Sequence, residues 1–282
     1  MKKLITLYFI IFLCLTNNIF SQQDTTKKFG WFPSGVAALN LSQISLSNWT
    51  QGGENALSWV LTGDFSAKYV SESITFDNSL KLAYGRTKLG SEDIRTNDND
   101  MYLVNLISKN IGWSVNPFFS NSVRTAITTG YDYSLTPSQE IANFFDPGYV
   151  TQTLGLTYDK EKFFNTRLGI ALQETFTKNN TKYSDDPATT EVETSKIETG
   201  IESVTNLEYT LAQNLLLKSS LRIFTRFKDL SAWDVRWDNA IVAKVNDFIN
   251  VNFTFLAIYQ KDQIDRLQVK EALQLGIVYT IF

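Results

Sequence analysis

Charged side chains at even-numbered positions between residues 196 and 245 are the residues best suited to chemistry. Both signs occur in this stripe, which comprises Glu198, Glu202, Lys218, Arg222, Arg226, Asp234, Arg236 and Asp238. A turn centred on Ala212 would place Glu202 opposite Arg222 and Glu198 opposite Arg226 across two paired strands. Each such pair would stabilise a sheet by about 0.2–1 kcal/mol. The stripe would form either a constriction that selects solutes or a salt-bridge ladder that fills the interior, and we favour the ladder.

Histidine is absent, which excludes Ser-His-Asp catalysis, Cys-His catalysis and imidazole metal ligation. The one cysteine, Cys14, lies in the N-terminal apolar run. A carboxylate base would have to come from Asp98 and Asp100 or from Asp185 and Asp186. No activated nucleophile lies near them, so we interpret them as solvated charges. We therefore predict no catalytic residue, no metal ligand and no cofactor.

The segment from Asn48 to Asn55 is the most unusual loop of the sequence. It is either a ligand-binding or gating loop or a glycine turn between strands, and paired glycines favour the turn. The residues that would form a loop site are Asn48, Trp49, Gln51, Gly52, Gly53 and Asn55.

The elements that carry these residues alternate between apolar and polar positions. Leu57, Trp59 and Leu61 alternate with polar residues before a tight connection, and the phase inverts in the segment that follows it. The alternation recurs as far as Arg266–Phe282, where the chain stops on an aromatic residue. No run after the N-terminus approaches eighteen apolar residues, so helical membrane spans are not predicted. The pattern predicts an all-β fold, a single transmembrane antiparallel up-and-down β-barrel of about twelve strands, with ten to fourteen in range.

The connections alternate between short links and long ones, such as a long link expected at 88–99, apart from a brief link near Asp229 to Ser231 that should be long. Barrels have short periplasmic turns and longer extracellular loops. The loop at 179–195 would then be extracellular, and both chain ends periplasmic. Aromatic residues gather near both kinds of connection, including Phe118 and Phe119 at the short turns and Trp59 and Tyr84 at the long loops. An exported β-sandwich would also alternate, but it does not need such aromatic belts.

Residues 1–21 read as a secretory signal, with Lys2 and Lys3 before an apolar run that is too short for a membrane helix. Residues 22–282 would form the barrel domain in the cell outer membrane. The balance of 26 basic and 29 acidic residues gives no basic field for nucleic acid. We expect outer-membrane lipid and the barrel-assembly machinery as partners, and a small solute is a further candidate.

Three segments resemble a known family. They are LSQISLSNWTQGGENALSW (Leu41 to Trp59), LKLAYGRTK (Leu80 to Lys88) and TGYDYS (Thr129 to Ser134). They resemble the domain of unknown function 3078 family of Gram-negative, Bacteroidetes-type bacteria, over most of the mature chain. The resemblance implies an outer-membrane β-barrel and supplies no activity, ligand or catalytic residue.

The leading hypothesis is a non-enzymatic outer-membrane barrel, porin-like in class, that acts as a narrow channel or a binding barrel for small solutes. The alternatives are a surface receptor or adhesin that works through extracellular loops, and a barrel hydrolase without histidine. The final strand leaves one question open, because Tyr279 and Phe282 have opposite parity. Either a bulge intervenes or Phe282 turns away as an interfacial aromatic.

Overall fold

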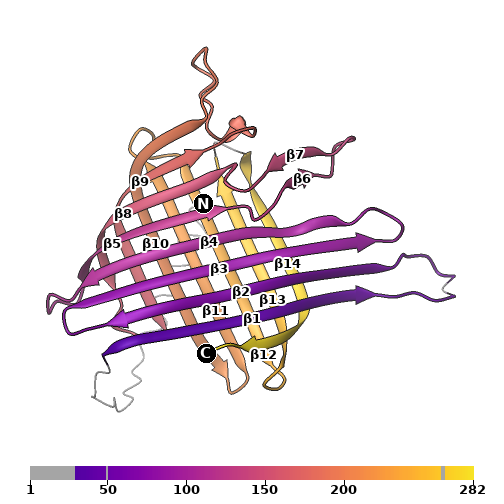
Figure 1. The fold of residues 1–282 in the computed structure, drawn as a ribbon, viewed down its shortest axis with the longest axis horizontal. Helices are drawn as coiled ribbons and strands as arrows, with labels where there is room; N and C mark the ends of the chain where they lie inside the picture. The colour runs from indigo at the N-terminus through magenta and orange to yellow at the C-terminus, as the bar shows by residue number, and fades with distance from the viewer. Residues whose placement is uncertain (1–28, 49, 262–263) are drawn as a thin grey trace.

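Period-two alternation places one row of side chains outside and the other inside a closed sheet. The computed structural model describes residues 29–48, 50–261 and 264–282. Twelve strands of the described chain close into an antiparallel barrel, which confirms the predicted fold (Figure 1). The barrel strands are β1 (Gly30–Ile44), β2 (Ala56–Val70), β3 (Ile74–Leu89), β4 (Arg95–Lys109), β5 (Asn116–Thr125), β8 (Gly148–Tyr158), β9 (Phe164–Phe176), β10 (Ser195–Ala212), β11 (Leu215–Arg226), β12 (Trp233–Lys244), β13 (Ile249–Gln260) and β14 (Ile264–Thr280).

The two faces of the wall differ as the alternation predicts. Ile197 of β10 is 66% exposed on the outer face, and Leu154 of β8 is equally exposed. The inward Glu202 and Phe224 are 2% and 0% exposed. The interior is thus packed with polar groups and a few rings. Phe118 is a correction to the predicted aromatic belt, because its side chain is buried inside the barrel.

The links between strands alternate between the two ends of the barrel. We call the end where β1 begins and β14 finishes the terminal end, and the opposite end the loop end. Links at the terminal end are short, whereas the loop end carries the longer links at 45–55, 126–147 and 177–194. The link at 126–147 contains a separate hairpin of β6 (Gly130–Asp132) and β7 (Gln139–Ala142), and the link at 177–194 contains the short 3-10 helix η1 (Thr181–Tyr183).

Two predicted boundaries at the loop end were wrong. The link expected at 88–99 shrinks to 90–94, because β3 and β4 remain paired as far as Thr87 and Arg95 past a bulge at Gly85. In the sequence, Tyr131 alternates in phase with Val123 and Thr125 of β5, which predicts one continuous strand. Tyr131 pairs instead with β7, since alternation alone does not reveal where a strand leaves the wall.

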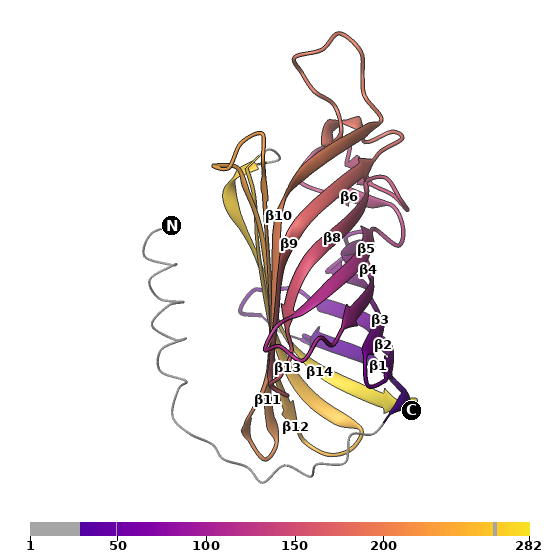
Figure 2. The same ribbon diagram turned by 90° about the vertical axis from the view of Figure 1, so that its left-hand side faces the viewer.

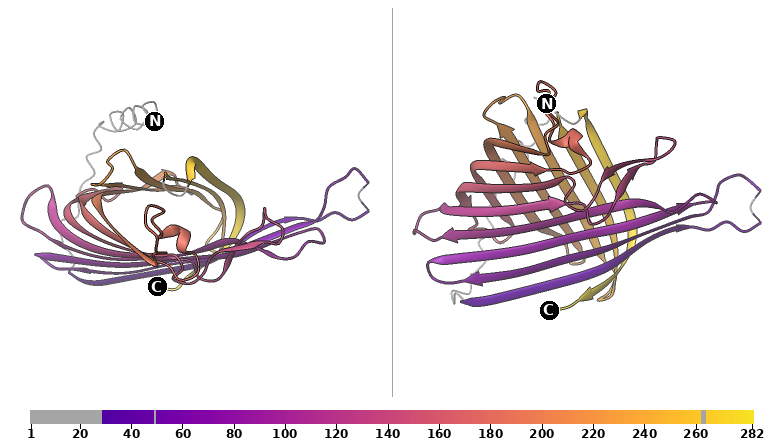
Figure 3. Two further views of the ribbon diagram at one scale, coloured as in Figure 1. Left: turned by 90° about the horizontal axis from the view of Figure 1, so that it is seen from above. Right: turned by 45° about the horizontal axis from the view of Figure 1, so that its top comes forward.

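The barrel is a flattened ring rather than a round one, with two facing walls (Figures 2 and 3). Strands β8 and β9 form the bend between the walls on one side. Small inward residues occupy this region: Gly155 pairs with Gly169, and Gly200 of β10 pairs with Ala171 of β9. A Cβ at Gly155 would meet the backbone of Leu168, so the backbones approach here too closely for a side chain.

Gly200→Ala is expected to prevent correct folding of most of the protein. The new Cβ would collide with the backbone carbonyl of Thr225 on β11, which cannot move aside as a flexible side chain can. The temperature at which folded protein loses its fast-migrating form on electrophoresis reports the effect. Gly130→Ala is the matched control, because the nearest atoms to its Cβ lie 3.5 Å or more away. Equal melting of the two variants would contradict the close approach.

The barrel closes along a short seam between β1 and β14. Only six residue pairs join them, from Val36 with Thr280 to Leu41 with Leu275, whereas β1 and β2 are paired along the whole of β1. Inside the seam, the Asn252 amide donates to Asn40 Oδ1 at 2.8 Å. The two side chains meet over Gly276, where a Cβ would lie 2.9 Å from each. Beyond Leu275, the rest of β14 toward the loop end is paired with β13 alone.

Phe282 lies at the terminal end, just past β14. The Ile281 N–H donates to the Gly35 carbonyl at 2.8 Å, and the Gly35 N–H donates to the Phe282 carbonyl at 3.1 Å. A Cβ at Gly35 would lie 3.1 Å from the Phe282 ring and 3.2 Å from the Phe65 ring. Gly35 pairs with Phe65. The ring of Phe282 therefore lies against the Gly35–Phe65 pair. Tyr279 lies within β14 and Phe282 lies past its end at Thr280, so the strand alternation does not fix the face of Phe282.

Asp146 ties together the two longest links of the loop end. Its buried carboxylate accepts hydrogen bonds from the backbone N–H groups of Lys178, Asn179 and Asn180 at 2.8–3.2 Å, and from the Asn180 amide at 3.2 Å. Burial raises the pKa of the Asp146 carboxyl, but these hydrogen bonds outweigh burial and hold the pKa below its ordinary value of 3.8. Asp146 is therefore a charged anchor for the start of the link at 177–194.

Asp146→Asn is expected to make the link at 177–194 several-fold more sensitive to proteolysis at neutral pH. The amide replaces an acceptor oxygen by a donor that faces backbone N–H groups. In the wild type the carboxylate's stabilisation is complete above the ordinary pKa, and it is lost as the pH falls through the lowered pKa of the folded state. Limited proteolysis with mass mapping checks this. Asp132→Asn should leave the cleavage rate unchanged, because the Asp132 carboxylate accepts its hydrogen bonds from the N–H and hydroxyl of nearby Ser134.

Candidate functional site

Most of the predicted charged stripe lies inside the barrel, in its loop-end half. Arg226, at the end of β11, donates to Glu198 Oε1 from Nε at 2.6 Å and to Asp234 Oδ2 from Nη2 at 2.8 Å. Lys196 adds a further ion pair to Glu198 at 2.8 Å. Three adjacent strands, β10, β11 and β12, thus hold a chain of alternating charges in which each buried ion has a partner.

A second ion pair lies four residues farther from the loop end along the same two strands, β10 and β11. Arg222 Nε donates to Glu202 Oε1 at 2.7 Å, and its Nη2 donates to Gln173 Oε1 at 2.8 Å. The other oxygen of Glu202 accepts a hydrogen bond from the Thr153 hydroxyl at 2.6 Å. Every oxygen of this carboxylate is therefore engaged, which a buried ion pair requires.

The predicted register of these pairs was wrong by two residues, although both predicted partnerships form. Glu202 lies directly opposite Phe224, and Arg226 lies opposite Gly200, because the turn follows Ala212 at residues 213–214. The ion pairs are consequently diagonal across β10 and β11. Diagonal neighbours are about 7–8 Å apart at the backbone, a span that the long arginine side chain covers.

Facing walls of the barrel touch at Asp100 of β4. Its carboxylate accepts hydrogen bonds from Arg124 of β5 at 3.3 Å and lies 3.8 Å from Nη2 of Arg236. Arg236 belongs to β12, which five strands separate from β4 in either direction around the barrel. Arg236 also forms a bidentate pair with Asp238 on its own strand at 2.9 and 3.1 Å. These groups form a charged bridge between opposite sides of the lumen.

Asp98 makes a second contact across the interior. Its carboxylate lies 2.6 Å from Nζ of Lys270 on β14, and Lys270 also donates to the Asn97 carbonyl at 3.0 Å. Asp98, Asp100 and Lys270 were not part of the predicted stripe. Strands that are not neighbours bring them together, so no sequence spacing could pair them.

The space left beside the charged bridge is small. A cavity of about 160 Å³ lies between Tyr102 and Arg124 on one wall and Arg222, Asp234 and Arg236 on the other. At about 30 Å³ per molecule, it has room for a few waters. Arg124 stacks over the Tyr102 ring at 4.1 Å, which fixes its guanidinium at the cavity wall. The loop-end half of the lumen is therefore narrow and lined by charge.

Lys218 stands apart from the rest of the stripe. Its Nζ lies 3.3 Å from Glu208, toward the terminal end, and both side chains are about half exposed. The structure thus brings together seven of the eight predicted stripe residues in or beside the narrow half of the lumen and leaves Lys218 outside it.

The segment from Asn48 to Asn55 forms most of the link between β1 and β2. The Leu46 N–H donates to Asn55 Oδ1 at 2.7 Å, and the Asn55 carbonyl accepts from Gly90 N–H at 2.7 Å. Gly52 and Gly53 have positive φ angles of 80° and 105°, as a tight turn requires. This geometry explains the glycines and Asn55 as turn residues. Trp49 lies outside the described residues, and a ligand for this loop stays a prediction.

The four carboxylates considered as catalytic bases are engaged in contacts within the barrel or its links. Asp98 and Asp100 form the contacts described above, Asp185 accepts from the Glu193 N–H at 3.2 Å, and Asp186 accepts from the Ala188 N–H at 3.0 Å. Across residues 29–48, 50–261 and 264–282, no group of three or more acidic or cysteine side chains is arranged to hold a metal ion. In the same part of the chain no helix is long and apolar enough to cross a membrane.

Fold and site together define a closed β-barrel with an apolar exterior and a narrow, charge-lined lumen. A family model described as "Protein of unknown function (DUF3078)" matches residues 41–131, and the resemblance seen in the sequence is confirmed there. The matched residues run from β1 through β6 and include Asp98 and Asp100. The predicted signal at residues 1–21 lies outside the described residues.

Several solved structures are similar to this chain over most of its length, at low sequence identity. The translocator domain of autotransporter NalP from Neisseria meningitidis is 11% identical, with 91% of this chain and 90% of that chain covered and a TM-score of 0.38. The COG4313 outer membrane channel from Pseudomonas putida F1 is 12% identical, with coverage of 93% and 99% and a TM-score of 0.42. The beta domain of the Bordetella autotransporter BrkA is 8% identical, with coverage of 89% and 99% and a TM-score of 0.33. No curated protein sequence matches the chain.

Proposed function

We propose that the chain is a non-enzymatic outer-membrane barrel that passes small polar solutes through a narrow, charged lumen. The observation that carries this proposal is the charged bridge from Asp100 to Arg236 between opposite walls, at 3.8 Å. A lumen crossed by such a contact leaves too little space for large solutes. Charges of both signs next to it replace part of the hydration of a small ion or zwitterion.

The membrane setting is supported by the outer face. Leu154 and Leu156 of β8, Leu168 and Ile170 of β9, and Ile197 of β10 are all more than half exposed there. Soluble monomers rarely expose so much contiguous apolar surface. Aromatic pairs lie at both ends of this band, such as Trp31 with Tyr69 at 5.3 Å and Trp59 with Tyr84 at 5.9 Å. Outer-membrane lipid is accordingly the expected surrounding, reached by export and the barrel-assembly machinery.

Reconstitution of the folded full chain in planar bilayers tests the proposal. We expect small, stable conductance steps for monovalent ions, well below those of sixteen-stranded open barrels. In liposome-swelling assays, glycine should enter and a trisaccharide should not. Persistent absence of conductance would overturn solute passage, and steps as large as those of open porins would overturn the narrow lumen.

A further inference from the structure

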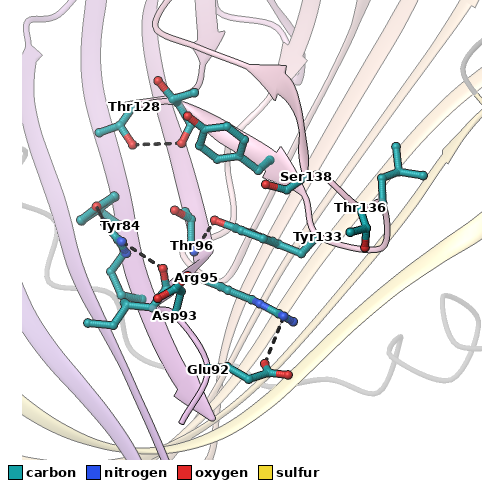
Figure 4. A pocket seen from close by; sticks show the side chains of 14 residues that line it. Tyr84, Glu92, Asp93, Arg95, Thr96, Thr128, Tyr133, Thr136 and Ser138 are labelled. Carbon is teal, nitrogen blue, oxygen red and sulfur yellow. Dashed lines mark hydrogen bonds and ion pairs between the residues drawn. The ribbon is translucent and has the colours of Figure 1, made fainter. Parts of the chain in front are cut away.

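A second, larger cavity lies on the outer side of the barrel wall at the loop end (Figure 4). Its volume is about 770 Å³, within the range of small-molecule sites. Tyr84 and Arg86 of β3 line it, and they pair with Leu61 and Trp59 of β2. Leu61 is 52% exposed on the outer face. Directly paired residues share a face, so this cavity is separate from the lumen.

The link that carries the β6–β7 hairpin forms the opposite wall of this outer cavity, and side-chain contacts hold it in place. Asn99 of β4 accepts hydrogen bonds from the N–H groups of Ile127 and Thr128 at 2.9 Å, and donates to the Thr128 carbonyl at 2.6 Å. The Tyr133 hydroxyl accepts from the Thr96 N–H at 3.0 Å. These bonds preform the cavity, which lowers the entropy cost of binding.

The charges that line the outer cavity are balanced. Arg95 forms an ion pair with Glu92 at 3.1 Å, and its guanidinium lies 5.4 Å from the centre of the Tyr133 ring. Asp93 adds one negative charge and Arg86 one positive charge. A balanced lining does not favour a strongly charged ligand of either sign.

The Arg86 guanidinium has N–H donors that are not engaged in hydrogen bonds within the described residues. It donates to the Tyr84 hydroxyl at 3.1 Å and to the Ile94 carbonyl at 3.2 Å, and its buried Nε has no hydrogen-bond partner. No carboxylate in the described residues forms an ion pair with it. A guanidinium with five N–H groups and two engaged contacts is suited to bind ligand oxygens.

The rest of the lining offers matched donors and acceptors around flat rings. Tyr84, Tyr131 and Tyr133 supply three aromatic rings, and five threonine or serine side chains supply hydroxyls. Sugar hydroxyls both donate and accept hydrogen bonds, and the C–H faces of a sugar ring pack on aromatic faces. Carboxylates, guanidinium groups and hydroxyls together meet both needs, without the net charge that an ionic ligand would require.

We propose that the outer cavity between β3, β4 and the β6–β7 hairpin binds a saccharide. This site is independent of solute passage through the lumen, because it lies on the other face of the wall. The saccharide would be either a free oligosaccharide or the sugar portion of a glycolipid in the adjacent leaflet. Both present the same hydroxyl-rich chemistry, and experiment separates them.

Calorimetric titration of the folded full chain in detergent with maltotriose, cellotriose and chitotriose tests the soluble form. Flotation with phospholipid vesicles, with and without a glycosylated lipid, tests the membrane form, with the protein presented in nanodiscs. We expect saturable binding in at least one arm, and Arg86→Ala should weaken it roughly tenfold or more. Arg86→Gln keeps two donors and should lose less. Arg266→Ala, at an exposed arginine of β14 that does not line the cavity, is the matched control.

The outcomes decide the proposal. Binding of a trisaccharide identifies a free oligosaccharide, and enrichment on glycolipid vesicles alone identifies a membrane sugar. No binding in either arm overturns the proposal, as does tighter binding of inorganic phosphate than of any sugar. Equal weakening by Arg86→Ala and Arg266→Ala would also overturn it, provided that both variants keep the electrophoretic mobility of the folded barrel.

Discussion

Asp100→Ala is expected to raise the single-channel conductance several-fold and to shift selectivity toward anions. The substitution removes the carboxylate between Arg124 and Arg236, which lie on facing walls of the barrel. The Arg124 and Arg236 guanidinium groups then face each other without the carboxylate that lay between them, and Asp238 remains as a partner of Arg236 alone. Their repulsion pushes the walls apart. The same positive charges would attract anions into the widened space.

Planar-bilayer recordings with a salt gradient measure both effects. Asp100→Asn should fall between the wild type and alanine, because the amide oxygen still accepts one hydrogen bond. The control is the double variant Glu208→Ala/Lys218→Ala, whose half-exposed pair lies away from the charged bridge. If Asp100→Ala conducts as the wild type does, the charged bridge does not limit the lumen.

Glu202→Ala is expected to lower the free energy of unfolding by about 3–5 kcal/mol, the usual cost of breaking a buried ion pair. The side chain is 2% exposed, and its loss leaves the Arg222 guanidinium without its carboxylate partner. The Thr153 hydroxyl would also lose its acceptor. Urea unfolding in lipid vesicles, followed by tryptophan fluorescence, measures the change.

Two further variants identify the cause. Replacing both partners, Glu202→Leu with Arg222→Leu, should recover most of the lost stability, since no unpaired charge then remains inside. Glu208→Ala removes an exposed carboxylate and should change stability by less than about 0.5 kcal/mol. A double variant as unstable as Glu202→Ala would show that packing, rather than charge, determines the loss.

Much of this fold was predictable from local pattern. Parity alone separated the exposed Ile197 and Ile201 from the inward Glu198 and Glu202, because each side of a strand meets a different environment. Counting such segments gave the twelve strands of the barrel. The ion partners of Arg222 and Arg226 were also predictable, since diagonal reach tolerates a two-residue error in register.

The remaining features depend on three-dimensional shape that no local pattern encodes. The contact between Asp100 and Arg236 joins strands on opposite sides of a flattened barrel, and the backbones approach closely at Gly155, Gly169 and Gly200. Phe118 has the aromatic character of an interfacial residue, yet it fills the interior. Predicting the outer cavity around Tyr133 would have required knowing that the β6–β7 hairpin leaves the barrel wall and folds back against it.

The seam between β1 and β14 has a consequence for the order in which the protein assembles. Every other interface of the barrel joins strands that follow one another closely in the chain, whereas this one joins Val36 to Thr280. The six residue pairs of the seam must compensate for the chain entropy that is lost when the two edges of the sheet are brought together. Closure should therefore be the last step of folding, and the first to be undone when the barrel loosens. Amide hydrogens of residues 275–280 that bond to β1 would exchange sooner than those in the middle of β3, because the seam opens before the rest of the barrel.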